Sequence, residues 1–347
     1  MGGPVRRTYQ KATLRDVARV AGVSPSTASR VLNGGDLRVS ERLSTRVLAV
    51  AESLGYVSNQ AAQALRGRRT AIVLLASDPR TASIAAIAAG MEAAGREHGA
   101  LASITGAGSG AEAHRTALEV LRGMRPRALV VASASFADVR SEQVLPELER
   151  FRADGCSVVF IGEHDMPFPT VRFDDIELGR TVGRFMGRLG RRRAAVLTTP
   201  HQPALESRTK GFLHGLAECG IDPDAVTVEH CDLTRDGGRD AARRVALARP
   251  RPDLVLAGND VIAIGALNEF RRLGIDVPSD IAISGVDDIP LSRDVNPPLT
   301  TVTLPFAEAG RLALEMALSP EPVQDPVLQG SLVVRASTPR DGFEAVR

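Results

Sequence analysis

The outer face of one short predicted helix carries side chains that suit a polyanion. Within the segment TLRDVARVAGVSPSTASRVLN, residues 13–33, the second predicted helix exposes Ser26, Ser29, Arg30 and Asn33. Hydroxyl, guanidinium and amide groups with no carboxylate among them hydrogen-bond phosphate oxygens and base edges. The face therefore suits contact with DNA, although for the segment taken alone an ordinary helical hairpin with a solvated polar face is the favoured interpretation.

The signals that begin and end helices position this face. Thr13 and Asp16, three residues apart, predict a capping box at the start of the first helix. Gly22 predicts a left-handed end to that helix, and Ser24 followed by Pro25 predicts the start of the second. The short connection is typical of a helix-turn-helix. One face of the first helix is apolar, at Leu14, Val17, Ala18 and Ala21.

Two further segments complete the first part of the chain. Ser40 and Gly55 bound a third predicted helix with an apolar inner face. The stretch SNQAAQALRGRR, residues 58–69, contains good helix formers but is too short to be stable alone. Leu65 is expected to be exposed there among arginines, which is the composition of a side chain that wedges into a minor groove. A plain charged linker is the alternative for this stretch.

The charge is distributed unevenly along the 347 residues. Residues 1–69 carry twelve Arg or Lys against four Asp or Glu, whereas the remainder carries thirty-one against thirty-seven. The small net charge of +2 therefore conceals a basic head on an acidic body. This asymmetry is expected of a polyanion-binding module fused to a second domain.

Several classes of site are not indicated. Cys156, Cys219 and Cys231 lack the spacing of a disulfide framework or a zinc site, and a reducing cytoplasm fits them best. The sequence has no signal-peptide pattern and no run of about 18 apolar residues, so no membrane partner is expected. The turn of Gly106 and Gly108 lacks the later acidic residue of a dinucleotide site. We expect no metal, no cofactor and no catalytic residue, and hence no enzyme.

From residue 70 the pattern changes to apolar strands alternating with amphipathic helices. Segments such as AIVLLAS, ALVVASA, SVVFIG, AAVLTT and DLVLAG predict strands of parallel sheets covered on both faces. Two such series predict an α/β body of two doubly wound lobes, with a ligand cleft at the carboxyl ends of the strands.

The chain resembles the lactose repressor (LacI) family of bacterial transcription factors over essentially its whole length. Besides the head segment, the likeness lies in VSERLSTRVLAVAESLGYVSNQAAQALRG, RFDDIELGRTVGRFMGRLGRRRAAVLTT, RTKGF, LVLAGNDVIAIGAL, VPSDIAISGVDD, NPPLTTV and LVVRAST. The resemblance implies a DNA-binding head at 1–57, a hinge helix at 58–69 and a periplasmic-binding-protein-like body at 70–347. Lobe 1 is expected at about 70–163 and 304–331, and lobe 2 at about 164–303 and 332–347.

The resemblance also implies roles in DNA binding. It places Pro25, Ser26 and Arg30 at base-reading positions, with most of the discrimination resting on Arg30. It assigns phosphate contacts to Thr13, Ser24, Ser29 and Asn33. It assigns the minor-groove contacts of the hinge to Asn59, Ala62 and Leu65. The implied partner is a near-palindromic double-stranded operator bound by a homodimer in the cytoplasm.

In the cleft, the resemblance matches Arg208, Asn259 and Asp287 to effector-contacting positions. An arginine facing a carboxylate suits a sugar or another polar metabolite; a structural ion pair is the alternative for Arg208 and Asp287. The aromatic residues that many relatives carry are missing here. Ser77 and Asp78, after the first strand of the body, are then expected to supply the opposite side of the cleft.

Three other functions compete with a ligand-responsive repressor. A solute-binding protein of a transporter would have two lobes, but it predicts a signal peptide and no basic head. A nucleotide-cofactor enzyme rests on the Gly106 turn alone. A ligand-independent architectural DNA protein is compatible with the scarcity of aromatic residues in the cleft.

Overall fold

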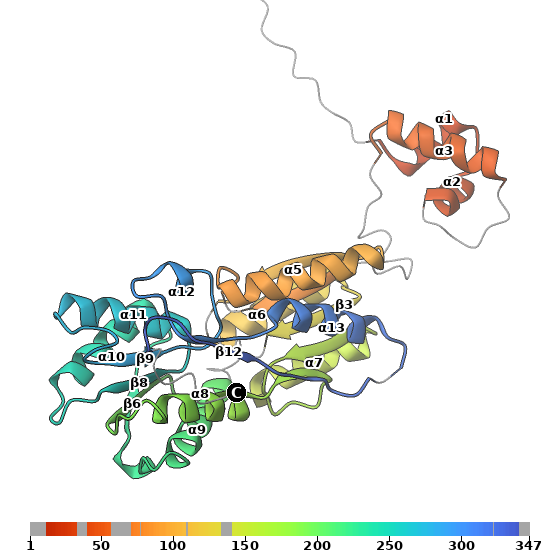
Figure 1. Ribbon diagram of the computed structural model, residues 1–347. Coiled ribbons are helices and arrows are strands. Elements are labelled where there is room, and N and C mark those ends of the chain that lie inside the picture. Colours follow the sequence, from red (N-terminus) through yellow and green to blue (C-terminus); the bar gives the residue numbers. More distant parts are fainter. Residues whose placement is uncertain are drawn as a thin grey trace, which may run out of the picture. The chain divides into compact units, whose positions relative to one another are not determined.

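A computed structural model describes residues 12–32, 40–56, 71–76, 78–108, 110–132, 141–321 and 323–339. Its contacts divide the chain into two compact units, Met1–Arg69 and Thr70–Arg347 (Figure 1).

The first unit is a small all-α domain. Its helices are α1 (Leu14–Ala21), α2 (Pro25–Leu32) and α3 (Glu41–Ser53). They close around a core of small side chains, namely Val17, Ala18, Ala21, Ala28, Val47 and Ala51. Small core residues let the helices approach closely, so three short helices bury a continuous interior.

The predicted helix boundaries of this unit are confirmed by the backbone. Thr13 and Asp16 form the capping box, and Gly22 ends α1 with φ 65° in the left-handed region. The amide of Thr27 donates to Ser24 Oγ at 3.1 Å, so Ser24 caps α2. Ser40 occupies the N-cap position of α3 but makes no side-chain capping bond. The turn between α1 and α2 is therefore fixed by hydrogen bonds within the turn itself.

Lobe 1 of the second unit is built on a six-stranded sheet in the order β11-β5-β4-β3-β1-β2. These strands are β1 (Ala71–Ala76), β2 (Leu101–Gly106), β3 (Ala128–Ala132), β4 (Ser157–Ile161), β5 (Thr170–Phe173) and β11 (Val327–Leu328). The covering helices are α5 (Ala82–Glu97), α6 (Ala111–Met124), α7 (Ser141–Ala153) and α13 (Phe306–Leu318). Alternate residues of β1 enter separate cores on the two faces, as continuous apolar strands predict.

Lobe 2 contains a four-stranded parallel sheet in the order β7-β6-β8-β9. Its strands are β6 (Ala194–Thr198), β7 (Thr227–His230), β8 (Leu254–Ala257) and β9 (Ala282–Ser284). Helices α8 (Asp175–Gly187) and α9 (Pro203–Ala217) cover one face, and α10 (Arg235–Leu247) and α11 (Asp260–Arg272) the other. A 3₁₀ turn at Pro223–Ala225 and a short helix α12 (Leu291–Asp294) complete the lobe. The fold class of helical head and α/β body is thus confirmed.

The chain crosses between the lobes at places that the sequence analysis located only in part. Thr170–Phe173 was expected in lobe 2, but its pairing with β4 makes it a strand of the lobe 1 sheet. The expected boundary at residue 164 is therefore wrong, and lobe 2 begins at α8. Strands β10 (Thr301–Thr303) and β12 (Ser331–Val333) pair antiparallel and form a separate two-stranded sheet. In Figure 1, α13 of the C-terminal part lies beside α5.

Two aromatic side chains join the interiors of the lobes at these crossings. Phe173 at the end of β5 and Phe306 at the start of α13 contact edge to face, with ring centroids 5.5 Å apart. Both pack against a core cluster of lobe 1 and a core cluster of lobe 2. The crossing segments are therefore anchored in both lobes.

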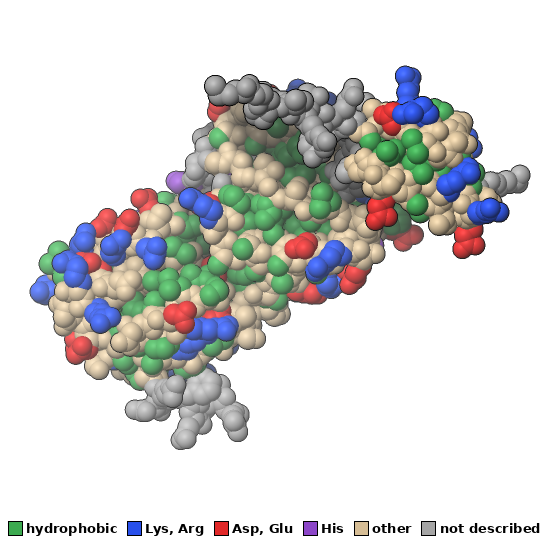
Figure 2. All heavy atoms as spheres, turned by 90° about the horizontal axis from the view of Figure 1, so that it is seen from above, with side chains coloured by type: hydrophobic (Ala, Val, Ile, Leu, Met, Phe, Trp, Pro, Cys, Tyr) green, Lys and Arg blue, Asp and Glu red, His purple; other side chains and the backbone are tan. Residues whose placement is uncertain are grey.

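The surface of the body differs from the basic head. On the face drawn in Figure 2, side chains of both charge signs are interspersed between apolar ones. On α10 and α11, for example, Arg243 pairs with Asp240 and with Glu269. Among the described residues, no helix is long and apolar enough to cross a membrane.

Candidate functional site

The outer face of α2 is presented to solvent as the sequence predicts. Pro25, Ser26 and Arg30 are exposed, and Ser29 is half-buried. Ala28, in the same helix, is fully buried and orients it. The guanidinium of Arg30 is thus available on the surface of a basic domain, which is the chemistry that a guanine edge or a phosphate requires.

The two N-cap residues of this region have hydroxyls already engaged within the head. Thr13 Oγ1 donates to Asp16 Oδ2 at 2.7 Å, and Ser24 Oγ lies 2.8 Å from Thr27 Oγ1. Both residues are nevertheless exposed. Their predicted phosphate contacts remain predictions, and Asn33, Asn59, Ala62 and Leu65 lie outside the described residues.

In the body, glycines bring α8 and α9 into backbone contact. A Cβ on Gly179 of α8 would lie 2.2 Å from the carbonyl oxygen of Arg208 on α9. A Cβ on Gly211 of α9 would lie 2.2 Å from the carbonyl oxygen of Ile176. No side chain fits into either gap, so glycine is required at both positions. This close approach sets the first turn of α8 beside Arg208.

The guanidinium of Arg208 lies between two carboxylates. Its Nε donates to Asp175 Oδ1 at 2.7 Å, and its Nη1 donates to Asp287 Oδ1 at 3.2 Å. Nη1 also donates to the carbonyl oxygen of Gly258 at 3.0 Å. The side chains of Arg208 and Asp175 are only 7% and 3% exposed. Arg208, Asp175 and Asp287 are called the Arg208 cluster below.

Arg208 and Asp287 are therefore joined in the ion pair that was the alternative to effector contacts, and Asp175, which the sequence did not single out, is a third member. Their effector contacts remain predictions. Asp175 is the first residue of α8, and the segment RFDDIELGR was noted only as part of a family likeness. Two adjacent aspartates at a strand-to-helix junction were the available signal. Asp174 caps the helix, because its carboxylate accepts from the amide of Glu177. The adjacent carboxylate of Asp175 accepts from Arg208.

The end of β8 supplies a second polar layer. Asn259 is buried, and its Oδ1 accepts from the amide of Ile262 at 3.0 Å, so it caps α11. Asp260 is fully buried and accepts from the amide of Ile289 and from the hydroxyls of Ser292 and Thr301. These bonds fix the loop that carries Asp287 relative to β8.

Asp287 has a backbone conformation that L residues rarely adopt, with φ 113°. The conformation is imposed by neighbouring bonds. The amide of Asp287 donates to Val302 at 2.9 Å, and the next carboxylate, Asp288, accepts from Arg335 at 2.6 Å. Strain of this kind costs about 1–3 kcal/mol and is concentrated at functional sites. The loop thus holds the Asp287 carboxylate toward Arg208 at a cost in stability.

Two carboxylates share one guanidinium in this cluster, so their negative charges are incompletely balanced. Burial raises the pKa of Asp287 to about 6, because the opposing effect of Arg208 is outweighed by desolvation and by Asp175. Burial also raises the pKa of Asp175. Burial and the nearby Asp287 raise the pKa of Asp260 to about 7. The cluster therefore favours groups that donate hydrogen bonds and disfavours anions.

Asp78, which is predicted to supply the opposite side of the cleft, forms a local ion pair with Arg80. Its carboxylate accepts from Arg80 Nε and Nη2, both at 2.9 Å, and this pairing lowers the pKa of Asp78 to about 2. Among the contacts of the described residues, none joins Asp78 to the Arg208 cluster. Ser77 lies outside those residues. Among the described residues, Glu163 of lobe 1 reaches this region through its hydrogen bond with Ser207, and the sequence did not single it out.

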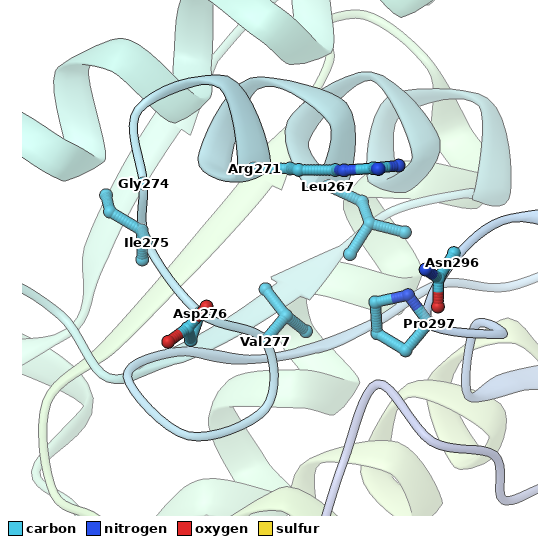
Figure 3. Close-up of a pocket in the computed structure, with 8 residues that line it drawn as sticks. All are labelled: Leu267, Arg271, Gly274, Ile275, Asp276, Val277, Asn296 and Pro297. Carbon is cyan, nitrogen blue, oxygen red and sulfur yellow. The ribbon is translucent and has the colours of Figure 1, made fainter.

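A separate hollow of about 250 Å³ lies at the end of α11, and none of its lining residues belongs to the Arg208 cluster (Figure 3). Leu267, Val277 and Pro297 form its apolar wall, and Arg271, Asp276 and Asn296 lie at its rim. Its rim residues are exposed, so it is a shallow surface feature. Within the described ranges, no group of His, Cys, Asp and Glu residues has the arrangement of a metal site.

Comparison with known proteins identifies the kind of molecule to which this architecture belongs. A family model described as bacterial regulatory proteins, lacI family, matches residues 13–59, and one described as a periplasmic binding protein-like domain matches residues 184–338. A helix-turn-helix head followed by such a body defines a transcriptional regulator.

Individual relatives agree over nearly the whole chain. The HTH-type transcriptional regulator GalS of Salmonella typhimurium is 32% identical over 310 residues, covering 88% of this chain and 89% of GalS. CelR of Thermobifida fusca is 30% identical, covering 94% of this chain and 98% of CelR. The solved lac repressor dimer bound to operator and an anti-inducer matches with a TM-score of 0.79 and 26% identity, covering 95% of this chain and 99% of that one. The chain belongs to the lacI family of bacterial regulatory proteins.

Proposed function

We infer that this protein represses transcription by binding an operator in double-stranded DNA as a homodimer. The observation that carries the proposal is the exposed polar face of α2, with Ser26 and Arg30, on a domain whose core is fully formed. The basic charge of residues 1–69 supplies the general attraction to phosphates. The lac repressor structure contains a dimer on operator DNA, which supports the same arrangement here.

In this proposal Arg30 reads a guanine through its guanidinium, while Ser26 and Pro25 shape the contact with neighbouring bases. Thr13, Ser24, Ser29 and Asn33 contact phosphates, and Asn59, Ala62 and Leu65 contact the minor groove between the two half-sites. A near-palindromic operator follows from the two-fold symmetry of a dimer. The protein acts in the cytoplasm, where the DNA is.

We further propose that a small polar molecule binds at the Arg208 cluster and sets the affinity for the operator. Arg208, Asp287 and Asn259 are the contacts we assign to it, with Asp175 as an additional acceptor. CelR, a relative, has been solved with cellobiose, which supports a sugar-like ligand. A neutral molecule rich in hydroxyl groups matches the acceptors, whereas the described residues of this cluster offer no aromatic face for stacking.

The proposal is tested by selecting genomic DNA fragments with the purified full-length protein and footprinting the bound fragments at moderate salt. We expect a protected near-palindrome with two half-sites about one helical turn apart. Binding that is equally tight to every fragment would contradict it and favour an architectural DNA protein. A thermal-shift screen of sugars, polyols and nucleosides then identifies the effector, because a ligand at 100 times its Kd stabilises the folded state by about 2.7 kcal/mol.

A further inference from the structure

One side-chain hydrogen bond joins the two lobes directly beside the Arg208 cluster. Ser207 Oγ, on α9 of lobe 2, donates to Glu163 Oε2, on the loop after β4 of lobe 1, at 2.8 Å. Ser207 immediately precedes Arg208 in the chain. The contact therefore lies within one residue of the proposed ligand site and connects it to the other lobe.

Glu163 is held in place on both sides along the chain. The amide of the preceding Gly162 donates to the carbonyl oxygen of Val171 on β5 at 2.8 Å. The following His164 bonds Thr170 through Nε2 at 2.7 Å and accepts from the amide of Met166 at 3.0 Å. The loop thus moves with the lobe 1 sheet, and so does the Glu163 backbone.

Ser207 is equally fixed to lobe 2. It is 6% exposed. Its helix is held against α8 by the glycine contacts, and the next residue is held by Asp175 and Asp287. Since each partner is fixed to its own lobe, the Ser207–Glu163 distance reports the arrangement of the two lobes.

The bond is also suited to breaking and re-forming. Glu163 is exposed, so its carboxylate is well hydrated when the bond opens, and opening costs little. When the bond is closed, the charge of Glu163 adds to the burial that raises the pKa of Asp175. Closing therefore brings a third carboxylate toward two that share one arginine. A bound molecule that donates hydrogen bonds offsets this repulsion.

We propose that Glu163 and Ser207 form a latch between the lobes, through which occupancy of the Arg208 cluster changes the lobe arrangement. Glu163 acts as a positioning residue of lobe 1. The coupling to DNA rests on the function proposed above. The latch itself rests only on the contact between the lobes.

The first test is hydrogen–deuterium exchange measured by mass spectrometry on the full-length protein without ligand. In Glu163→Ala and in Ser207→Ala, we expect exchange to rise about three- to tenfold in peptides of residues 162–168 and 203–207. This factor corresponds to the loss of one charge-assisted hydrogen bond at the surface. The double variant should exchange no faster than either single variant, because both remove the same bond. Glu163→Gln retains an oxygen acceptor and should retain most of the protection.

Two internal controls separate a latch from a general loss of stability. Peptides of β6 in the lobe 2 core should exchange as in the wild-type protein. Glu92→Ala, which removes an exposed carboxylate of lobe 1 whose partner Arg96 is 3.8 Å away, should change neither latch peptide. Unchanged exchange in both single variants, or a rise throughout lobe 2, overturns the latch.

The second test measures the Kd for an operator fragment obtained from the footprinting experiment. We expect Glu163→Ala and Ser207→Ala to change this Kd by at least about threefold and in the same direction, and Glu92→Ala to leave it unchanged. An operator Kd equal to that of the wild-type protein in both variants overturns the coupling, even if exchange rises. If the wild-type protein shows no specific DNA binding, the proposed function fails, and the exchange experiment still decides whether the latch exists.

Discussion

The Arg208 Nη1 atom lies 3.2 Å from Asp287 Oδ1, and the two residues come from segments far apart in the sequence, α9 and the loop after β9. The same guanidinium holds Asp175 through Nε. These contacts form a structural ion pair and also leave acceptor atoms for a ligand. A structural role and a ligand-binding role predict different effects of substitutions.

Arg208→Ala should be severely destabilising, because it leaves two buried carboxylates without a partner. Breaking a buried pair on one side costs about 3–5 kcal/mol. Asp287→Asn removes one charge but keeps an oxygen acceptor for Nη1, so its cost should be clearly smaller. Urea unfolding of both variants measures the difference. Equal stability of Arg208→Ala and wild-type protein would show that the cluster contributes nothing to folding and acts on the ligand alone.

Gly179→Ala should weaken the packing that places Arg208. The added methyl group would lie 2.2 Å from the Arg208 carbonyl oxygen, so α8 and α9 must separate. Overpacking of this kind lowers the free energy of unfolding by about 1–3 kcal/mol, and it should also weaken ligand binding.

The matched control for this substitution is Gly123→Ala on α6, where a Cβ would meet no atom within 4 Å. Exchanging glycine for alanine at an unhindered helical position stabilises by about 0.4–1 kcal/mol. The two changes are chemically identical, so opposite effects on the melting temperature would isolate the helix contact. A stabilised Gly179→Ala variant would contradict the assigned packing.

Some parts of the structure can be predicted from the sequence and others cannot. The head follows from local rules, since the caps at Thr13, Gly22 and Ser24 depend on residues within four positions. The apolar strands of the body also predict their own burial. The role of Asp175 does not follow in this way, because its partner Arg208 is 33 residues away and meets it only through the glycine contact of two helices.

The lobe boundary and the surroundings of Asp78 depend on contacts that position along a strand does not reveal. Thr170–Phe173 is short, and its pairing with β4 and β11 assigns it to lobe 1. Asp78 is predicted in the cleft because it follows a strand. In the structure its carboxylate pairs with Arg80, two residues later. Where a segment or side chain lies depends on its ion pairs and on strand pairing as well as on its position along a strand. A single sequence does not show which of these contacts form.

The buried Asp260 should make stability depend on pH in an unusual direction. Its pKa is about 7 in the folded protein, against 3.8 as the ordinary value. Between these values the folded state binds the proton and the unfolded state does not, so stability falls as pH rises and levels off above about pH 7. Asp260→Asn removes the titrating group and should remove this part of the pH dependence.

His164 acts in the opposite sense within part of the same range, because burial lowers its pKa from 6.5 to about 4. Its contribution raises stability as pH rises from about 4 to 6.5. The quantity to measure is therefore the difference in unfolding free energy between Asp260→Asn and wild-type protein, from pH 4 to pH 8. A difference that is constant over this range would show that Asp260 does not titrate there.

Arg30→Ala should relax sequence specificity rather than abolish DNA binding. Arg30 is exposed on α2 beside Ser26 and Pro25, neither of which offers a side chain able to make two bonds to one base. Loss of a bidentate arginine–guanine contact costs about 1–3 kcal/mol, or about 5- to 150-fold in affinity for the correct operator. Binding to unrelated DNA, which depends on total charge, should weaken far less.

Arg15→Ala is the matched control, since Arg15 is an exposed arginine on α1, and its removal changes the charge of the head equally. It should lower the affinity for operator and for unrelated DNA by similar factors, so that their ratio is unchanged. Fluorescence anisotropy at matched salt gives both affinities for each variant, because the electrostatic part of binding varies with ionic strength. If Arg30→Ala preserved the ratio while Arg15→Ala reduced it, base reading would have to be assigned to α1 and not to the outer face of α2.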